Sequence, residues 1–207
     1  MSIITQIGPL HARALAIVFS PHKEWQIIAA EDRPSGEVLL RYALPLSLIW
    51  PICATLGTLR TGQIAYGFGA YSGLAAPSLT QLIINGMYCT LLSLGSVLAL
   101  GTFISMISPR FGGSSESDRS FALAAYSATP VFLIGVAALV PPLSWLSLLG
   151  LWGIALLGIG APIMLGIPRE RRLGFVLAVV AMGFLMNLAI SLLLQFNART
   201  VVEMGLA

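Results

Sequence analysis

The chain has 207 residues, of which 57% are hydrophobic and only 9% are charged, and its net charge is +3. Soluble domains carry about 25% charged residues. A mean hydropathy of +0.90 therefore excludes an ordinary soluble protein and indicates a surface covered mostly by lipid. Although its net charge is positive, the chain contains no run of cations with interleaved aromatic residues, which argues against nucleic acid binding.

Residues 1–40 are predicted to form a cytoplasmic or interfacial arm and not a span. Ser20 can cap a helix whose first position is Pro21, and Trp25 and Ile28 share one face of that helix. This pattern predicts an amphipathic helix on the inner leaflet, with Trp25 at headgroup depth. The alternative is an ordinary cytoplasmic helix packed on the loops.

The gaps between charged residues predict five transmembrane helices, because a span needs about 20 apolar residues. The segment 61–77 is rich in glycine and tyrosine, which is typical of an interfacial loop with Tyr66, Phe68 and Tyr71 as aromatic-belt residues. The Pro141-Pro142 pair divides one long gap into two spans. The membrane domain, residues 41–196, then precedes a short tail at 197–207 and has spans at about 42–59, 78–108, 120–140, 143–166 and 173–195.

The distribution of cations predicts the orientation. With the N-terminus in the cytoplasm, nine of the eleven cations lie inside, and only Arg60 and Arg199 lie outside. Cytoplasmic loops carry the excess of lysine and arginine in membrane proteins. The predicted fold is therefore an all-α, polytopic bundle of five transmembrane helices with an N-terminal amphipathic interfacial helix.

The predicted spans contain no Asp, Glu, Lys, Arg or His, which argues against a proton-coupled pump and an intramembrane metalloprotease. They do contain amides: Gln81 and Asn85 lie one turn apart in the second span, and Asn187 lies in the fifth. We expect these amides to hydrogen-bond between helices, and a polar lining for a solute path is the alternative. No catalytic, cofactor-binding or metal site is expected.

Four motifs follow one another along most of the chain: FSPHKEW (19–25), YALPLSLIWP (42–51), AAYSATP (124–130) and the fourth span with its basic exit loop (150–172). In this order and spacing they resemble the Yip family of integral membrane proteins, in its bacterial branch. The resemblance implies a five-helix domain in the bacterial cytoplasmic (inner) membrane, with a cytosolic N-terminus and a periplasmic C-terminus.

Tyr126 and Pro130 match the Tyr-Ser-x-x-Pro pattern of the family that the chain resembles. We expect Pro130 to bend the third helix and Tyr126 to hydrogen-bond a freed carbonyl. Eukaryotic relatives act in vesicle traffic and bind Rab-type GTPases. That role is not carried over, because their cytosolic arms are longer and a bacterium lacks the Rab partner.

Three functions are compatible with these features. The favoured one is a non-enzymatic adaptor, scaffold or membrane-organising factor. The alternative is a small channel or carrier for a neutral or apolar solute, lined by Gln81, Asn85 and Asn187 with Pro130 at a kink. A lipid-acting enzyme is the third, and its acid–base pair would be Glu116 and Asp118, which in an exposed loop more often serve as caps.

The partners expected for the favoured function are the lipid bilayer and, as open alternatives, anionic lipids, other membrane proteins and a second copy of the chain. The cations could also serve only to set the topology. The inner face would offer its partners Trp25, Arg110, Arg119, Arg169, Arg171 and Arg172.

Overall fold

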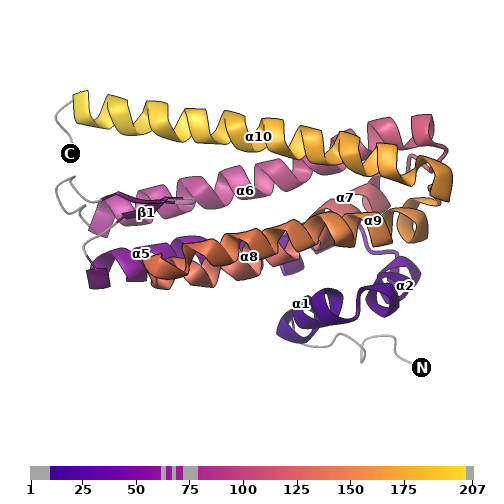
Figure 1. Ribbon diagram of the computed structural model, residues 1–207, viewed down its shortest axis with the longest axis horizontal. Coiled ribbons are helices and arrows are strands. Elements are labelled where there is room, and N and C mark those ends of the chain that lie inside the picture. Colours follow the sequence, from indigo (N-terminus) through magenta and orange to yellow (C-terminus); the bar gives the residue numbers. More distant parts are fainter. Residues whose placement is uncertain (1–9, 62–63, 67–68, 72–78, 204–207) are drawn as a thin grey trace.

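The computed structural model describes residues 10–61, 64–66, 69–71 and 79–203, most of which are helical. The axes of its long helices are roughly aligned, with α6 and α10 in one layer and α5, α8 and α9 in the other (Figure 1). Within the described residues, five helical segments are long and apolar enough to cross a membrane, which confirms the predicted all-α, five-span fold. These segments are Ser35–Arg60, Leu82–Phe111, Ser117–Leu139, Leu148–Leu165 and Arg169–Ala189.

Two short helices precede the first span: α1 (Leu10–Phe19) and α2 (Pro21–Glu31). Pro21 begins α2 as predicted, but the Ser20 side chain makes no capping hydrogen bond. The helix ends at Asp32, which adopts a left-handed conformation with φ 43°. This left-handed residue ends α2, and the first span begins three residues later at Ser35.

The first span begins at Ser35, several residues before the predicted position 42. It is interrupted near Pro45, whose missing N–H cannot continue the α-helical pattern, and a π-helical turn precedes this proline. The span consists of α3 (Ser35–Val38), the π-helix η2 (Leu39–Ala43), α4 (Leu44–Ser47) and α5 (Ile49–Thr61).

The predicted interfacial loop after the first span contains a small antiparallel β-hairpin. Its strands are β1 (Ile64–Tyr66) and β2 (Gly69–Tyr71), with Tyr66 opposite Gly69. Phe68 lies outside the described residues. Hydropathy could not indicate this hairpin, because three-residue strands are too short for an alternating pattern.

The remaining spans differ in regularity. The second and fifth are long helices, whereas the third and fourth are broken into segments. The predicted break at Pro141-Pro142 is present, since Val140 is extended and a 3₁₀ helix begins at Pro141. In chain order these elements are α6 (Leu79–Ile107), η3 (Ser108–Phe111), α7 (Ser117–Ser127), α8 (Thr129–Ile134), η4 (Gly135–Leu139), η5 (Pro141–Leu151), α9 (Trp152–Leu165) and α10 (Arg169–Glu203).

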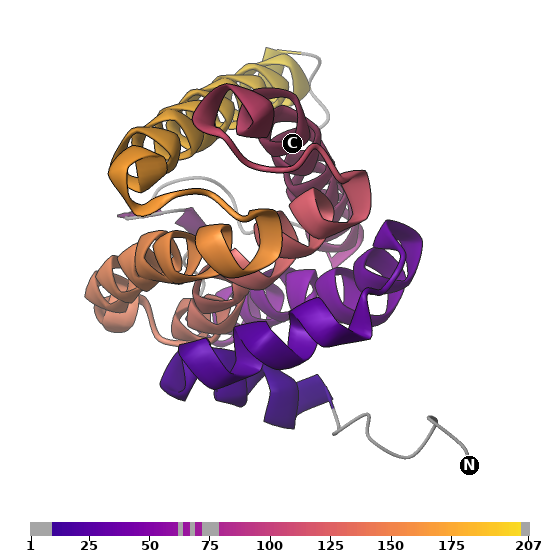
Figure 2. The same cartoon turned by 90° about the vertical axis from the view of Figure 1, so that its right-hand side faces the viewer.

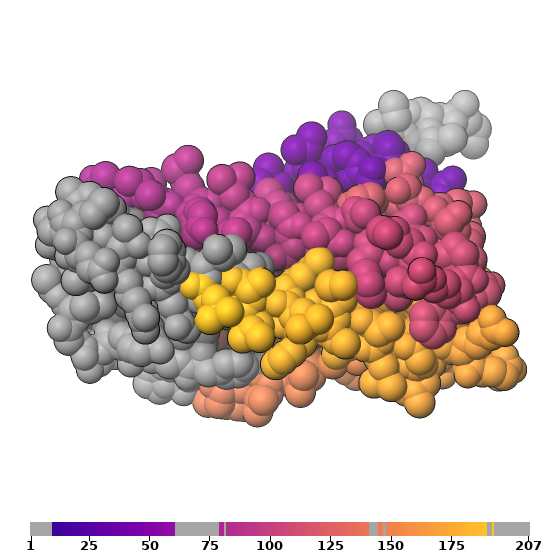
Figure 3. All heavy atoms as spheres, turned by 90° about the horizontal axis from the view of Figure 1, so that it is seen from above, coloured from indigo at the N-terminus to yellow at the C-terminus, as the bar shows by residue number. Residues whose placement is uncertain are grey.

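The hydrophobic core is centred on α7, which packs against α6 and α9. α10 contributes to the core near its start, through Phe175, Val176 and Val179. Figure 3 looks onto α10 and shows it on the outer surface of the bundle. The fifth span is therefore held mainly at one end.

Candidate functional site

The charged residues with described contacts gather at one end of the bundle, which we call the polar end. It is formed by α1 and α2, the segment 108–116 between α6 and α7, and the turn 166–168 between α9 and α10 (Figure 2). The turn follows from local sequence, because Gly166 ends α9 with φ 70° and Pro168 then prevents a continuous helix. The predicted inner-face residues all lie here.

Trp25 is fully buried (0% exposed) inside the protein and does not lie at headgroup depth. Its indole lies edge-on to the Tyr126 ring, with ring centroids 6.2 Å apart, and it packs on the backbone of Gly160. A Cβ at Gly160 would lie 2.6 Å from this indole, so the contact requires glycine. The expectation of a lipid-facing, partner-accessible Trp25 is corrected: α2 packs on the helix α9, and its apolar face is covered by protein.

A half-buried ion pair joins α1 to α2. The Arg13 guanidinium donates two hydrogen bonds to the Glu31 carboxylate, at 2.6 and 2.7 Å, and its Nε lies 3.4 Å from Glu24 Oε1. Desolvation alone would lower the pKa of Arg13, but the hydrogen bond to Glu31 and the nearby charges together raise this pKa. The pair therefore stays charged and connects α1 to α2 in a fixed geometry.

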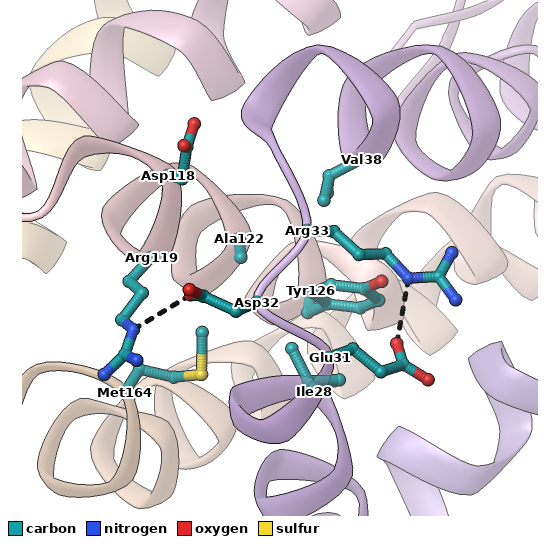
Figure 4. Close-up of a pocket in the computed structure, with 10 residues that line it drawn as sticks. All are labelled: Ile28, Glu31, Asp32, Arg33, Val38, Asp118, Arg119, Ala122, Tyr126 and Met164. Atoms are coloured by element: carbon teal, nitrogen blue, oxygen red, sulfur yellow. Dashed lines mark hydrogen bonds and ion pairs between the residues drawn. The ribbon is translucent and has the colours of Figure 1, made fainter. Parts of the chain in front are cut away.

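Further ion pairs connect the arm to the first and third spans. Arg119 on α7 contacts Asp32 Oδ1 at 3.2 Å and Glu116 Oε2 at 2.7 Å, and Arg33 contacts Glu31 at 3.0 Å (Figure 4). Asp118 accepts a hydrogen bond from the Ser35 N–H at 2.8 Å, at the start of α3. Glu116 and Asp118 are thus engaged in structural contacts.

A pocket of about 10 Å³ lies among these residues, with Asp32, Arg119 and Tyr126 in its lining (Figure 4). This volume suits about one water molecule. The pocket is therefore too small for a solute larger than water.

The third span is interrupted at Ala128, between α7 and α8, directly before Pro130. Pro130 has no N–H to donate to the carbonyl of Tyr126, four residues earlier. The Thr129 hydroxyl donates to this carbonyl at 2.7 Å, and the Tyr42 hydroxyl lies 2.7 Å from Thr129 Oγ1. Since Thr129 has one hydroxyl proton, Tyr42 is the donor to Thr129.

The third helix is thus interrupted beside Pro130, whereas its bend stays a prediction, and the expected role of Tyr126 is corrected. Tyr126 supplies the freed carbonyl, and Thr129 supplies the hydrogen bond to it. The Tyr126 ring packs between Trp25 and Tyr42, 4.2 Å from the Tyr42 centroid. A threonine beside a proline in a span was the signal that could have indicated this role.

The five predicted inner-face arginines fall into two groups. Arg119 is engaged in ion pairs, as described above. The other four are exposed, and the described residues offer them no ion pair; we call them the arginine face: Arg110, Arg169, Arg171 and Arg172.

One aromatic contact and one backbone contact join the two segments that carry the arginine face. Phe111 next to Arg110 stacks edge-on against Phe175 of α10, with centroids 5.8 Å apart. Gly112 lies against Pro168 and close to Arg171, since a Cβ at Gly112 would be 3.8 Å from Arg171 Nη1. The end of the second span and the start of the fifth therefore present their cations on one surface.

The amides predicted as a solute path lie on different helices. Asn85 on α6 is half-buried, whereas Asn187 on α10 is exposed. Gln81 lies in α6, and its side chain is outside the described part of the chain. The described pocket, lined at the polar end by Asp32 and Arg119, includes none of the three.

Sequence reasoning missed Arg13, Tyr42 and Thr129. Arg13 and Glu31 are far apart in sequence, so no local spacing could pair them. Tyr42 and Thr129 belong to different spans.

The family model described as the Yip1 domain matches residues 15–190. The chain is 30% identical over 170 residues to the inner membrane protein YohC of Escherichia coli K12, covering 80% of this chain and 85% of that protein. The protein of the same name from Escherichia coli O6:H1 matches with the same identity and coverage. No solved structure matches. The extent of these matches shows that the chain belongs to the Yip1 domain family.

Proposed function

We propose that the protein is a non-enzymatic membrane-organising factor of the bacterial inner membrane that gathers anionic phospholipids at its arginine face. The observation that carries the proposal is the exposure of Arg110, Arg169, Arg171 and Arg172 without ion-pair partners among the described residues. By contrast, Arg13, Arg33 and Arg119 at the same end are paired with carboxylates of the protein. The unpaired charges therefore remain available to lipid headgroups.

The proposed orientation places the polar end in the cytoplasm and the C-terminus in the periplasm. The cation distribution supports it, because nine of eleven lysine and arginine residues then lie inside. The inner membrane location is supported by the name of the E. coli relative. The cytoplasmic leaflet carries anionic headgroups, which attract cations next to a span by about 1 kcal/mol for each charge.

The carrier alternative has less support. Asn85 and Asn187 lie on different helices, and the described pocket at the polar end has a volume of only about 10 Å³. The lipid-enzyme alternative is also weakened, because Glu116 and Asp118 are engaged with Arg119 and Ser35. A scaffold needs neither a path nor a reactive pair.

The test is the relative association of spin-labelled phosphatidylglycerol over phosphatidylcholine with the full-length protein in bilayers. The wild type should prefer phosphatidylglycerol, and replacing the four arginines of the arginine face by glutamine should remove most of this preference. The expected loss approaches about fivefold for each charge at low salt. Screening at about 0.5 M salt should reduce the wild-type preference toward that of the variant.

A variant with lysine at the same four positions is the matched control, because it keeps the charge and should keep the preference. Reporters fused to the C-terminus check that every variant retains the wild-type orientation. An unchanged preference in the correctly oriented glutamine variant would refute the lipid-gathering proposal. A C-terminal reporter active only in the cytoplasm would refute the proposed orientation.

A further inference from the structure

The short helix α1 is apolar on the side that the described part of the bundle leaves uncovered. Its sequence, LHARALAIVF, contains a single Asp, Glu, Lys or Arg residue, Arg13, whose guanidinium is paired with carboxylates of α2. Ala14 and Ile17 are buried against the protein, whereas Leu15 and Phe19, one turn apart on another side, are 48% and 79% exposed. Whether water or lipid meets these two side chains depends on the depth of α1 in the membrane.

The charges of the first span mark the hydrocarbon layer along the bundle. Arg41 and Arg60 are both exposed, and no charged residue lies between them. At about 1.5 Å per residue the two arginines are about 28 Å apart, which matches a hydrocarbon layer about 30 Å thick. Ser35 begins the span at the polar end, where it contacts Asp118 of α7, and it lies about 9 Å outside Arg41. The hydrocarbon therefore begins about 9 Å from the level of Ser35.

A hydrogen bond to the fourth span places the end of α1 below this boundary. The Trp152 indole N–H donates to the Val18 carbonyl at 3.1 Å. Trp152 begins α9 and lies about 20 Å along this helix from Leu165, whose carbonyl accepts a hydrogen bond from the Ser114 N–H at the polar end. Arg41 lies only about 9 Å from the same end, so Val18 is on the hydrocarbon side of it.

The third span gives the same depth for α1. The helix packs on α8, which begins at Thr129, about 18 Å along the span from Ser117 at the polar end. Its neighbour α2 lies nearer the polar end, since Trp25 contacts Gly160 only about 8 Å from the end of α9. Figure 1 shows the same order, with α1 farther than α2 from the polar end, which is on the right. Lys23 of α2 is exposed, and at this level its ammonium can reach the headgroups.

We propose that residues 15–19 of α1 are immersed in the hydrocarbon of the leaflet at the polar end, where Leu15 and Phe19 contact acyl chains. Helices α1 and α2 then dip into the membrane from one side without crossing it, and the exposed side of α1 continues the lipid-facing surface of the spans. Arg13 does not oppose this position, because Glu24 and Glu31 neutralise its charge. Contact with acyl chains does not depend on headgroup charge, so the proposal is independent of lipid binding at the arginine face.

Spin labels on the full-length protein in bilayers test the immersion. The native Cys53 and Cys89, which are free thiols, are first replaced by alanine. A nitroxide is then attached to Leu15→Cys or to Phe19→Cys, two exposed positions where a label disturbs no packing. Its collision rate with oxygen, which concentrates in hydrocarbon, is compared with its collision rate with a nickel chelate, which stays in water.

Two further labels give the reference values. Ile52→Cys is the hydrocarbon reference, because Ile52 is exposed near the middle of the first span, and Ser117→Cys at the polar end is the aqueous reference. The ratio of oxygen to nickel collisions at positions 15 and 19 should be several times that at 117 and close to that at 52. A ratio equal to that at 117 would overturn the proposal, because water would then cover α1. Low collision rates with both reagents would also overturn it, because protein would then cover the helix.

Discussion

The third and fifth spans are similarly apolar but differ greatly in burial. Of an 18-residue stretch in each, 56% is buried in the third span and 11% in the fifth. The third span lies in the core, where Tyr126 and Thr129 are enclosed by other helices. The fifth lies on the outer surface (Figure 3), and most of its side chains, Asn187 among them, are exposed or only half-buried. Apolar composition therefore identifies a span without indicating whether protein or lipid surrounds it.

The physical reason is that lipid and protein interiors are about equally apolar. Exposing a leucine to lipid costs little free energy compared with burying it in protein, so membrane helices associate through close packing and polar contacts. The third span supplies both, whereas the described packing of the fifth is concentrated in its first turns. The same substitution in the two spans should consequently have unequal effects on stability.

Leu123→Ala should produce the largest difference. Leu123 is fully buried on α7, and truncating such a residue leaves a cavity that costs about 3 kcal/mol of unfolding free energy. Leu185→Ala on α10 is the matched control and should change this energy by less than about 0.5 kcal/mol, because its side chain faces lipid. Equilibrium unfolding in mixed micelles measures both. Equal losses at the two positions would contradict the contrast between the spans.

Two glycines of α9 offer a second test, since one faces the core and the other faces α10. Gly160→Val should destabilise the protein by about 2 kcal/mol, because its Cβ would overlap the Trp25 indole and Leu123. At Gly158 a Cβ would meet Val176 of α10 at 3.8 Å, an ordinary contact, so Gly158→Ala should be nearly neutral, whereas Gly160→Ala should already destabilise because its Cβ alone overlaps the indole.

Protease sensitivity of the arm provides a second measurement for this pair. The clash at Gly160 should displace α2 and expose it to cleavage. Persistence of a protected arm with unchanged unfolding energy in Gly160→Val would show that Trp25 does not occupy the Gly160 surface.

The spans were predictable from the sequence, whereas the neighbours of each span were not. The charge gaps gave the five spans because hydrocarbon thickness requires long uncharged stretches, and the Pro141-Pro142 break was visible for the same reason. The face containing Trp25 was also visible. The sequence could not show what covers this face, since an amphipathic pattern is equally compatible with lipid and with protein.

The arginines show the same limit within the candidate site. All five could be placed at one end from the charge pattern, but their division into paired and unpaired residues depends on distant partners. Asp32 pairs with Arg119 across two spans of sequence. Such a contact is set by the packing of α2 beside α7, which no local spacing encodes.

Thr129→Val tests the polar packing of the third span and has the smallest expected effect. The substitution preserves the shape of the side chain but removes the donor to the Tyr126 carbonyl and the acceptor for the Tyr42 hydroxyl. Hydrogen bonds between membrane helices contribute about 0.6 kcal/mol on average, so the two together should cost about 1–2 kcal/mol of unfolding free energy.

Thr102→Val on α6 is the control for Thr129→Val, because Thr102 is exposed and bonds only the Leu98 carbonyl of its own helix, at 2.9 Å. That carbonyl keeps its partner within the helix, so the control should stay within about 0.5 kcal/mol of the wild type. A loss in Thr129→Val no larger than in Thr102→Val would mean that the broken third helix does not need Thr129. The contrast with α10 would then rest on apolar packing alone, because the Pro130 break would be tolerated without a substitute hydrogen bond.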